Sequence, residues 1–166
     1  MPRPPREPLT IPLTNGGCTI VSVEDFEALS QFKWHARKYK TRNKSYSYAI
    51  RAMGYGKSQK IVRMHRAILD AGKTDLVDHI NGDTLDNRRE NLRIATKVQN
   101  AANQAGRRSK SGFKGVVQTP YGWKAVVCCN YKHHRMGPFT TAEQAARAYD
   151  AKAKELFGDF ARPNFN

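Results

Sequence analysis

The chain has 166 residues, 39% of them hydrophobic, which is enough for one ordinary domain or two small ones. Its 29 basic and 14 acidic residues give a net charge of +15, which indicates a polyanionic partner, usually nucleic acid, unless the charge only forms a solvated basic surface. No apolar run approaches the roughly 20 residues that span a bilayer, and the three cysteines lack C-x-x-C spacing. We therefore expect a cytoplasmic protein with reduced thiols, no membrane contact and no zinc site.

The segment before residue 76 predicts a small, largely antiparallel sheet with two short helices. The expected elements are a Pro-rich disordered arm at 1–10, strands at 11–14, 18–22, 34–40, 45–53 and 59–65, and helices at 24–32 and 65–71. Ser22 and Asp25 resemble a capping pair for the first helix. His65 begins the second helix, where we expect a packed structural histidine, with a catalytic role as the alternative.

Basic residues with interleaved tyrosines follow the predicted strands at 34–40 and 45–53. The residues expected to point outward are Lys38, Lys40, Arg42, Lys44 and Arg51. A basic rim of this kind suits contact with a phosphate backbone. Charged residues on edge strands also serve simply to keep sheets soluble, which is the alternative.

Residues 77–100, VDHINGDTLDNRRENLRIATKVQN, are unusually polar for the middle of a chain. The expected elements are a strand at 76–80, a loop at 81–91 with one helical turn at 88–91, a second strand at 92–96 and a helix at 97–104. Thr96 and Gln99 form a capping box at the start of that helix. Such a stretch is either a solvated loop, in which Asn and Asp only make turns, or a site.

A second module follows a linker of Gly, Ser and charged residues at 106–112. Its expected elements are strands at 113–119, 123–129 and 134–139 and a helix at 140–158. Thr140 and Glu143 form a capping box for this helix, and Gly158 ends it. An apolar stripe that includes Tyr149 is expected to lie on the sheet as part of a small core.

The polar segment contains the residue types that phosphodiester hydrolysis requires, namely a base, a cation and a group that holds the base in place. His79 can be the base, because the pKa of histidine lies near neutral pH. Asp78 and the amide oxygen of Asn100 can bind a hard cation, and Asn91 can fix the loop. Adjacent residues face opposite sides of a regular strand, so this site requires the strand to end or bulge at His79.

The stretch VDHINGDTLDNRRENLRIATKVQNAAN resembles the core motif of HNH homing endonucleases, in the variant whose last His is Asn. The earlier segments IPLT, KWHARK, YAIR and MHR are similar to the fuller phage-type form, so the resemblance spans residues 10–104. It implies a ββα-metal fold, His79 as base, Asn91 as the structural middle residue, and one divalent metal bound by Asp78 and Asn100. An amide ligand at the last position shifts the metal preference toward Mg²⁺ or Mn²⁺.

The stretches KGVVQTPYGWKAVV and GPFTTAEQAARAYDAKAKELFG and the terminal NF resemble the APETALA-type, or ethylene-response-factor-like, DNA-binding domain over residues 112–165. In that family a three-stranded sheet enters the major groove, which is one accepted way to read DNA. Lys114, Gly115 and Trp123 match the pattern, although a core role for Trp123 is equally open, and Lys124 and Arg135 are basic residues nearby. Val117, Thr119 and Cys128 depart from it, so bidentate guanine contacts by Arg are missing there and the target sequence is not transferable.

Together these features predict an α+β protein. Its antiparallel sheet leads into a ββα-metal core at 76–104, within an HNH domain at 11–105, and a DNA-binding domain follows at 113–166. The expected activity is homing-type, site-recognising cleavage of double-stranded DNA by a monomer, with one Mg²⁺ or Mn²⁺ per active site and no small-molecule substrate. The alternatives are a DNA-binding regulator with an inactive nuclease site and an RNA-binding accessory protein. The candidate DNA contacts are Lys38, Lys40, Arg42, Arg51, Arg88, Arg93, Lys114, Gly115, Trp123, Lys124 and Arg135.

Overall fold

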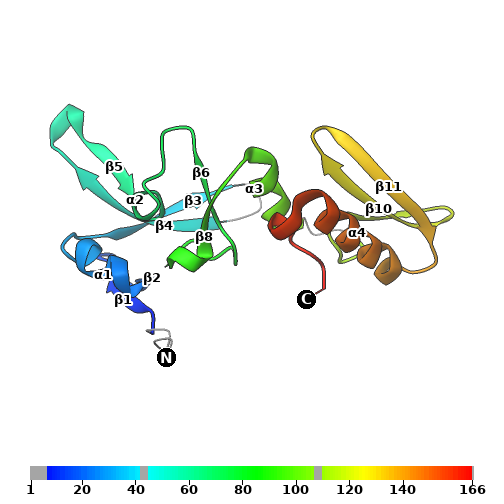
Figure 1. Cartoon of the computed structure of the whole chain (residues 1–166), viewed down its shortest axis with the longest axis horizontal. Coiled ribbons are helices and arrows are strands. Elements are labelled where there is room, and N and C mark those ends of the chain that lie inside the picture. The colour runs from blue at the N-terminus through cyan, green and yellow to red at the C-terminus, as the bar shows by residue number, and fades with distance from the viewer. Residues whose placement is uncertain (1–6, 42–44, 107–109, 166) are drawn as a thin grey trace, which may run out of the picture. The chain divides into compact units, whose positions relative to one another are not determined.

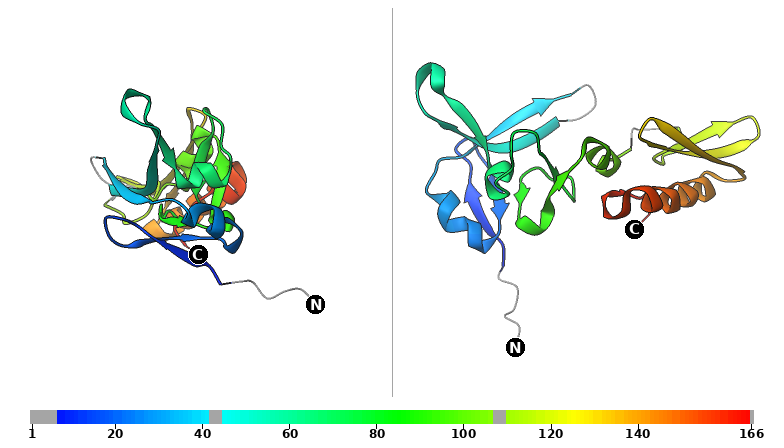
Figure 2. Two further views of the ribbon diagram at one scale, coloured as in Figure 1. Left: turned by 90° about the vertical axis from the view of Figure 1, so that its left-hand side faces the viewer. Right: turned by 45° about the horizontal axis from the view of Figure 1, so that its top comes forward.

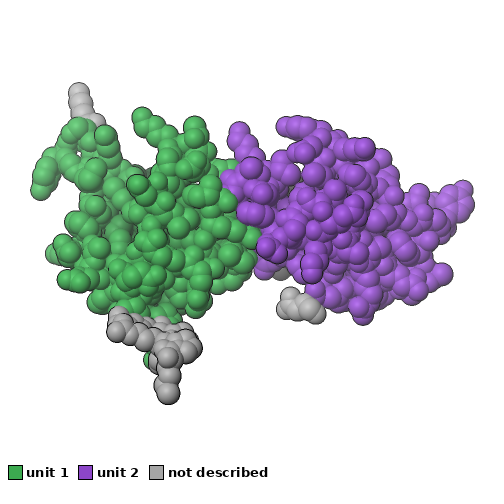
Figure 3. Space-filling model, viewed as in Figure 1, with its two compact units in different colours: residues 1–94 green, residues 95–166 purple. Residues whose placement is uncertain are grey.

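The computed structural model describes residues 7–41, 45–106 and 110–165 of the chain (Figure 1). Most of the predicted arm, and the two predicted phosphate contacts Arg42 and Lys44, lie outside the described residues. The chain divides into two compact units, Met1–Ile94 and Ala95–Asn166 (Figure 3). The domain boundaries inferred from the two family resemblances stay a prediction. Among the described residues, no helix is both long and apolar enough to cross a membrane.

The first unit consists of short strands and helices. Its elements are β1 (Leu9–Pro12), β2 (Cys18–Val21), α1 (Val23–Ser30), β3 (His35–Lys40), β4 (Ser45–Met53), η1 (Gly56–Ser58), β5 (Lys60–Arg63), α2 (Met64–Ile68), β6 (Leu76–His79), β7 (Asp86–Asn87), η2 (Arg89–Asn91) and β8 (Leu92–Ala95), whose last residue belongs to the second unit. The strand predicted at 59–65 is observed as the shorter β5, because Met64 already begins α2.

Three small sheets organise these strands. β1 pairs antiparallel with β2, and β7 adds to β2 in parallel. β3, β4 and β5 form an antiparallel sheet whose β4–β5 hairpin extends outward in the views of Figures 1 and 2. β6 pairs with β8. The predicted mixture of helices and small antiparallel sheets is therefore confirmed, whereas the short parallel strand β7 was not expected.

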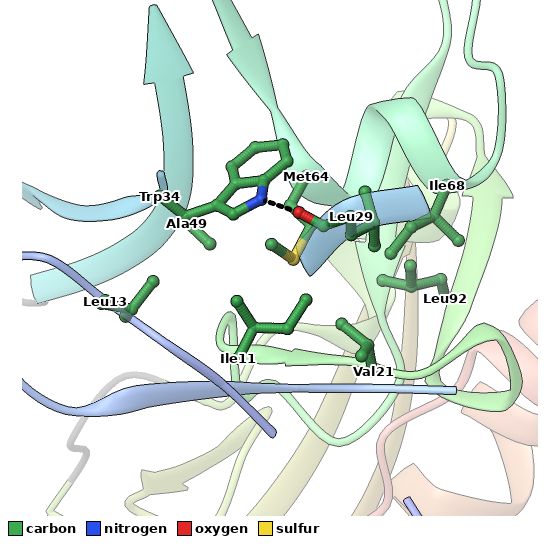
Figure 4. Packing of buried hydrophobic residues seen from close by; sticks show 9 residues of the cluster. All are labelled: Ile11, Leu13, Val21, Leu29, Trp34, Ala49, Met64, Ile68 and Leu92. Atoms are coloured by element: carbon green, nitrogen blue, oxygen red, sulfur yellow. Dashed lines mark hydrogen bonds between the residues drawn. The ribbon is translucent and has the colours of Figure 1, made fainter. Parts of the chain in front are cut away.

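A hydrophobic core holds these sheets together (Figure 4). Trp34 is 1% exposed, and its Nε1–H donates to the carbonyl of Leu29 at 2.8 Å, so its one polar atom is satisfied inside the core. Met64 and Ile68 lie four residues apart on α2 and both enter the same cluster. Their burial anchors α2, and with it His65, against the sheet.

The predicted cap of α1 was wrong. Ser22 precedes the helix but makes no side-chain cap hydrogen bond. Its hydroxyl instead accepts the backbone N–H of Arg89 at 2.9 Å, and Asp25 binds the guanidinium of Arg89 through both carboxylate oxygens at 2.7 and 2.8 Å. Both polar residues at the start of α1 therefore tie this helix to η2, which leads into the polar segment.

The second unit packs one long helix on a three-stranded sheet. Its elements are α3 (Lys97–Asn103), β9 (Val116–Thr119), β10 (Gly122–Cys129), β11 (Lys132–Phe139), α4 (Ala142–Phe157) and η3 (Gly158–Phe160). The sheet is antiparallel with β10 in the centre. Small buried alanines at 145, 146 and 153 let α4 approach the sheet closely, as its apolar stripe predicted. The predicted capping box at Thr140 and Glu143 was wrong, because Thr141 is the cap and accepts the N–H of Gln144.

Gly115 is required by packing in this unit. Its φ of +70° lies in the left-handed region that favours glycine, and a Cβ at this position would overlap the ring of Tyr149. Tyr149 belongs to α4 and is 6% exposed in the core between this helix and the sheet, as predicted. Gly115 was a candidate DNA contact by family resemblance, but packing against Tyr149 is enough to explain why a glycine occupies this position.

Candidate active site

The strand β6 ends at His79. A site that uses both Asp78 and His79 requires the strand to end or bulge at this position. Gly82 N–H donates to the carbonyl of His79 at 2.9 Å and turns the chain, while Ile80 N–H donates to the carbonyl of Asn91 at the same distance. Asp78 and His79 are both buried, at 6% and 5% exposure. The two adjacent side chains have different neighbours, as expected for residues on opposite sides of a strand.

His79 lies among aromatic rings and amide groups. Its Nε2 is 3.4 Å from Oδ1 of Asn87, and its ring centroid is 5.2 Å from that of His65 and 6.1 Å from that of Tyr48. Burial lowers the pKa of His79 below its ordinary value, against the opposing effects of the Asn87 hydrogen bond and of Asp78. The imidazole is therefore neutral at pH 7, which is the form that can accept a proton.

Asn91 braces the loop that follows His79. Its side chain is 5% exposed, and Oδ1 accepts the backbone N–H of Asn81 at 3.0 Å while Nδ2 donates to the carbonyl of Asp86 at 2.7 Å. Both ends of the loop are thereby tied to one amide group. Such contacts suit a residue that fixes the loop, which is the role that we predicted for Asn91.

Asp78 is paired with Arg93 of β8. Nε and Nη2 of Arg93 both lie 2.9 Å from Oδ2 of Asp78. Arg88 is similarly engaged, with Nε and Nη2 on the two carboxylate oxygens of Asp86 at 2.8 and 2.7 Å and with Nη1 on Glu90. The Arg88 contacts lower the pKa of the Asp86 carboxyl. Two arginines predicted to contact DNA thus already neutralise acidic groups within the fold.

Asn100, the predicted second metal ligand, lies in the second unit, at the start of α3. Its backbone N–H donates to the carbonyl of Thr96 at 2.9 Å, and its side chain is partly exposed. The capping box of Thr96 and Gln99 is confirmed, with both reciprocal hydrogen bonds present. Only Thr96 separates β8 from α3, so the chain passes directly from the paired strands into the helix that carries Asn100.

The remaining candidate DNA contacts of the first unit fall into two groups. Lys38 and Lys40 are exposed on β3. Arg51 stacks its guanidinium 3.8 Å from the ring centroid of Phe32 and is partly buried. The lysines therefore lie open to solvent, whereas Arg51 also contributes to packing beside Trp34.

In the second unit the sheet has one face under α4 and one face away from it. Ala125 and Val127 are buried beneath α4, so their neighbours Lys124 and Val126 point to the other face. Arg135 is exposed and lies directly opposite Val126, so it shares this outer face with Lys124. Trp123 instead packs against the cluster under α4.

Lys114 is also engaged within the second unit. Its Nζ donates to the carbonyl of Ala102 at 2.5 Å. Tyr121, by contrast, is 83% exposed in the turn between β9 and β10. Tyr121 was not among the predicted DNA contacts, although its position in the PYG turn marks it as a surface residue.

Three further side chains around His79 were not assigned to the site by sequence reasoning, namely Thr19, Asn87 and Tyr48. Thr19 and Asn87 are 0% exposed and bonded to each other at 2.7 Å, while Tyr48 lies 5.0 Å, ring to ring, from His65. No local pattern marks them, because they come from β2, β7 and β4. His65 was noted as a packed histidine beside the site, and it lies there at 6% exposure.

Acid is expected to destabilise the first unit through His65. Burial, with His79, Arg63 and Arg66 nearby, lowers the pKa of His65 to about 3 from an ordinary value of 6.5. Between these values the unfolded chain binds a proton that the folded chain does not. The free energy of unfolding should therefore fall as the pH falls, by up to about 1.4 kcal/mol per pH unit.

Urea unfolding at about pH 7 and about pH 5 measures this effect, and His65→Phe is the matched variant because it keeps a packed ring without a titrating nitrogen. The wild-type protein should lose about 1–2 kcal/mol more than the variant between the two pH values. Protonation of His79 contributes to the pH-dependent loss of stability in both proteins, so its effect cancels in the comparison. Equal losses would show that His65 is not held neutral by the fold.

Comparison with known proteins identifies the family of this chain from its sequence. The family described as HNH endonuclease matches residues 56–102, which include His79, Asn91 and Asn100. The uncharacterized HNH endonuclease L560 of Acanthamoeba polyphaga mimivirus is 35% identical over 152 residues, which are 90% of this chain and 75% of the viral protein.

Two plant proteins are also similar to the chain. The ethylene-responsive transcription factor ERF069 of Arabidopsis thaliana is 35% identical over 99 residues, 56% of this chain and 61% of the factor. The factor ERF084 of the same plant is 47% identical over 57 residues, 32% of this chain and 22% of its own. No solved structure gave a significant match. Because the viral relative aligns over three quarters of its own length, the chain belongs to the HNH endonuclease family.

Proposed function

We propose that the protein is a homing-type HNH endonuclease that hydrolyses phosphodiester bonds of double-stranded DNA, with His79 as the general base. The observation that carries the proposal is the placement of His79. It is a neutral, buried histidine at the end of β6, and the loop beyond it is braced at both ends by Asn91. A neutral imidazole held in one position is what removal of a proton from water requires.

Asp78 and Asn100 are the proposed ligands of one Mg²⁺ or Mn²⁺. A carboxylate and an amide oxygen are donors that suit a hard cation, and such a cation needs only one or two protein ligands besides water and phosphate. Asp78 is a buried carboxylate that pairs with Arg93, so a bound cation would share this carboxylate with the guanidinium. When bound, the metal supplies charge neutralisation at the phosphate and at the leaving oxygen.

The chain's own residues divide the remaining work. His79 takes the proton from the attacking water, and Asn91 keeps the loop from displacing the imidazole. The proposed arrangement is a ββα-metal core, with β6, β8 and α3 as its two strands and its helix.

DNA binding by the second unit is the other part of the proposal. Two relatives are named as transcription factors, and the outer face of the β9–β11 sheet carries Lys124 and Arg135. Val117 lies opposite Lys124 on this face, where the plant family has an arginine. Fewer arginines can read guanine bases, so this face is proposed to bind the duplex with weaker sequence discrimination.

A plasmid assay tests the nuclease assignment. The full chain with supercoiled plasmid and Mg²⁺ should produce nicked or linear DNA, and an excess of EDTA should abolish the product, because the proposed reaction requires a divalent cation. Restoring Mg²⁺ or Mn²⁺ should restore it. Binding to the plasmid without any cleavage in either metal would instead support a DNA-binding protein with an inactive nuclease site.

A further inference from the structure

A short chain of buried side chains lies behind His79 and has no part in the mechanism above. Asn87 of β7 donates from Nδ2 to the hydroxyl of Thr19 on β2 at 2.7 Å, and its Oδ1 is 3.4 Å from Nε2 of His79. Thr19 and Asn87 are both 0% exposed, so water cannot replace either partner. The parallel pairing of β7 with β2 brings these two residues together.

The direction of the Thr19 hydroxyl is fixed by its other neighbours. These are the carbonyl oxygen of Leu85 at 2.6 Å and the sulfur of Met64 at 3.9 Å. Both atoms can only accept hydrogen bonds, so the single hydroxyl proton is donated to one of them, and the closer carbonyl is the stronger acceptor. The oxygen of Thr19 is then left to accept, and the amide group of Asn87 must turn its NH₂ toward it.

This orientation of Asn87 determines which nitrogen of His79 carries the proton. With the NH₂ held at Thr19, the amide oxygen faces Nε2, and an amide oxygen can only accept. A lone pair on Nε2 would face the lone pairs of that oxygen, whereas an Nε2–H can donate to it. We infer that Thr19, acting through Asn87, holds neutral His79 as its Nε2–H tautomer, so that Nδ1 is the nitrogen that accepts the proton from water.

The inference rests on the proposed function only for the last of these steps. In the reaction, the O–H bond of water breaks and its proton bonds to Nδ1, while the hydroxide oxygen forms the new bond to phosphorus and the bond from phosphorus to the 3′ oxygen breaks. The leaving 3′ oxygen takes a proton from solvent water, which gives a 5′-phosphate and a 3′-hydroxyl. The imidazolium that results keeps its Nε2–H on Asn87, whose oxygen stabilises the positive charge. Thr19 and Asn87 are thus positioning residues, comparable in kind to the partners that fix the tautomer of a catalytic histidine.

The tautomer can be measured without any cleavage. Two-bond ¹H–¹⁵N correlation spectra of the full chain, recorded near pH 8 where the ring is neutral, separate a protonated from an unprotonated ring nitrogen. In the wild-type protein His79 should show a protonated Nε2 and an unprotonated Nδ1. A protonated Nδ1 in that spectrum would overturn the inference before any variant is made.

Variants of Thr19 test the relay. Thr19→Val removes the acceptor while keeping the shape, so Asn87 can rotate, and the two ¹⁵N shifts of His79 should move toward each other as the tautomers mix. Thr19→Ser keeps the hydroxyl and should restore the wild-type spectrum. Nicking should fall on the order of 10-fold in Thr19→Val and recover in Thr19→Ser. Wild-type ¹⁵N shifts in a folded Thr19→Val protein would sink the proposal.

The spectrum and the cleavage assay separate this inference from the nuclease proposal. A protonated Nε2 that responds to Thr19, in a protein whose nicking is insensitive to His79, would keep the tautomer and reject His79 as the base. A protonated Nδ1 together with loss of nicking in His79→Ala would keep His79 as the base and reject the inferred Nε2–H tautomer.

Discussion

Replacement of His79 by alanine is expected to lower the rate of plasmid nicking on the order of 10²–10⁴-fold, the usual contribution of a general base. DNA affinity should remain near the wild-type value, because His79 is 5% exposed and makes no part of the basic surface. The comparison requires the nicking rate at saturating DNA together with a separate binding isotherm. This separates loss of chemistry from loss of binding.

His35→Ala is the matched control for this experiment. It removes a histidine from β3 of the same unit, where His35 lies opposite Ile50 and outside the site. The control should nick at close to the wild-type rate. A His79→Ala protein that also cuts at the normal rate would remove His79 from the mechanism, whatever the metal requirement proves to be.

Regular local patterns made much of the fold predictable. The segment SYSYAIRAM predicted a strand at 45–53, and β4 occupies those residues, because β-rich residues alternate there around a turn signal. The Thr96–Gln99 capping box and the apolar stripe of α4 were also predictable from local patterns, since each depends on residues within about four positions of one another.

The interior of the polar segment was much less predictable. β7 consists of Asp86 and Asn87, two residues that are depleted in strands, and it exists because β2 pairs with it from a distant part of the chain. Partners of long side chains were equally hidden, since Arg93 meets Asp78 fifteen residues earlier in sequence. The sequence thus indicated His79 and Asn91 by motif but gave no sign of the Thr19–Asn87 support.

The affinity for duplex DNA is expected to fall about 10³-fold or more between about 50 and 200 mM salt, if six to eight phosphates are neutralised. The net charge of +15 makes this range reasonable, although not all of the basic residues contribute. Arg88 and Arg93 already pair with carboxylates, so the exposed Lys38, Lys40 and Arg135 should account for more of the response. Titrations at several salt concentrations give the slope directly.

Two lysines of the second unit provide a matched comparison for that slope. Lys124 lies on the sheet face away from α4, and Lys124→Ala should reduce the slope by about one unit, the value of one lost phosphate contact. Lys152 lies on α4 and pairs with Glu155 at 2.5 Å, so Lys152→Ala removes the same charge from the chain but no proposed contact. If the two variants change the slope equally, only net charge matters and the sheet face is not the DNA-binding surface. If only Lys124→Ala changes it, the duplex lies against β9–β11.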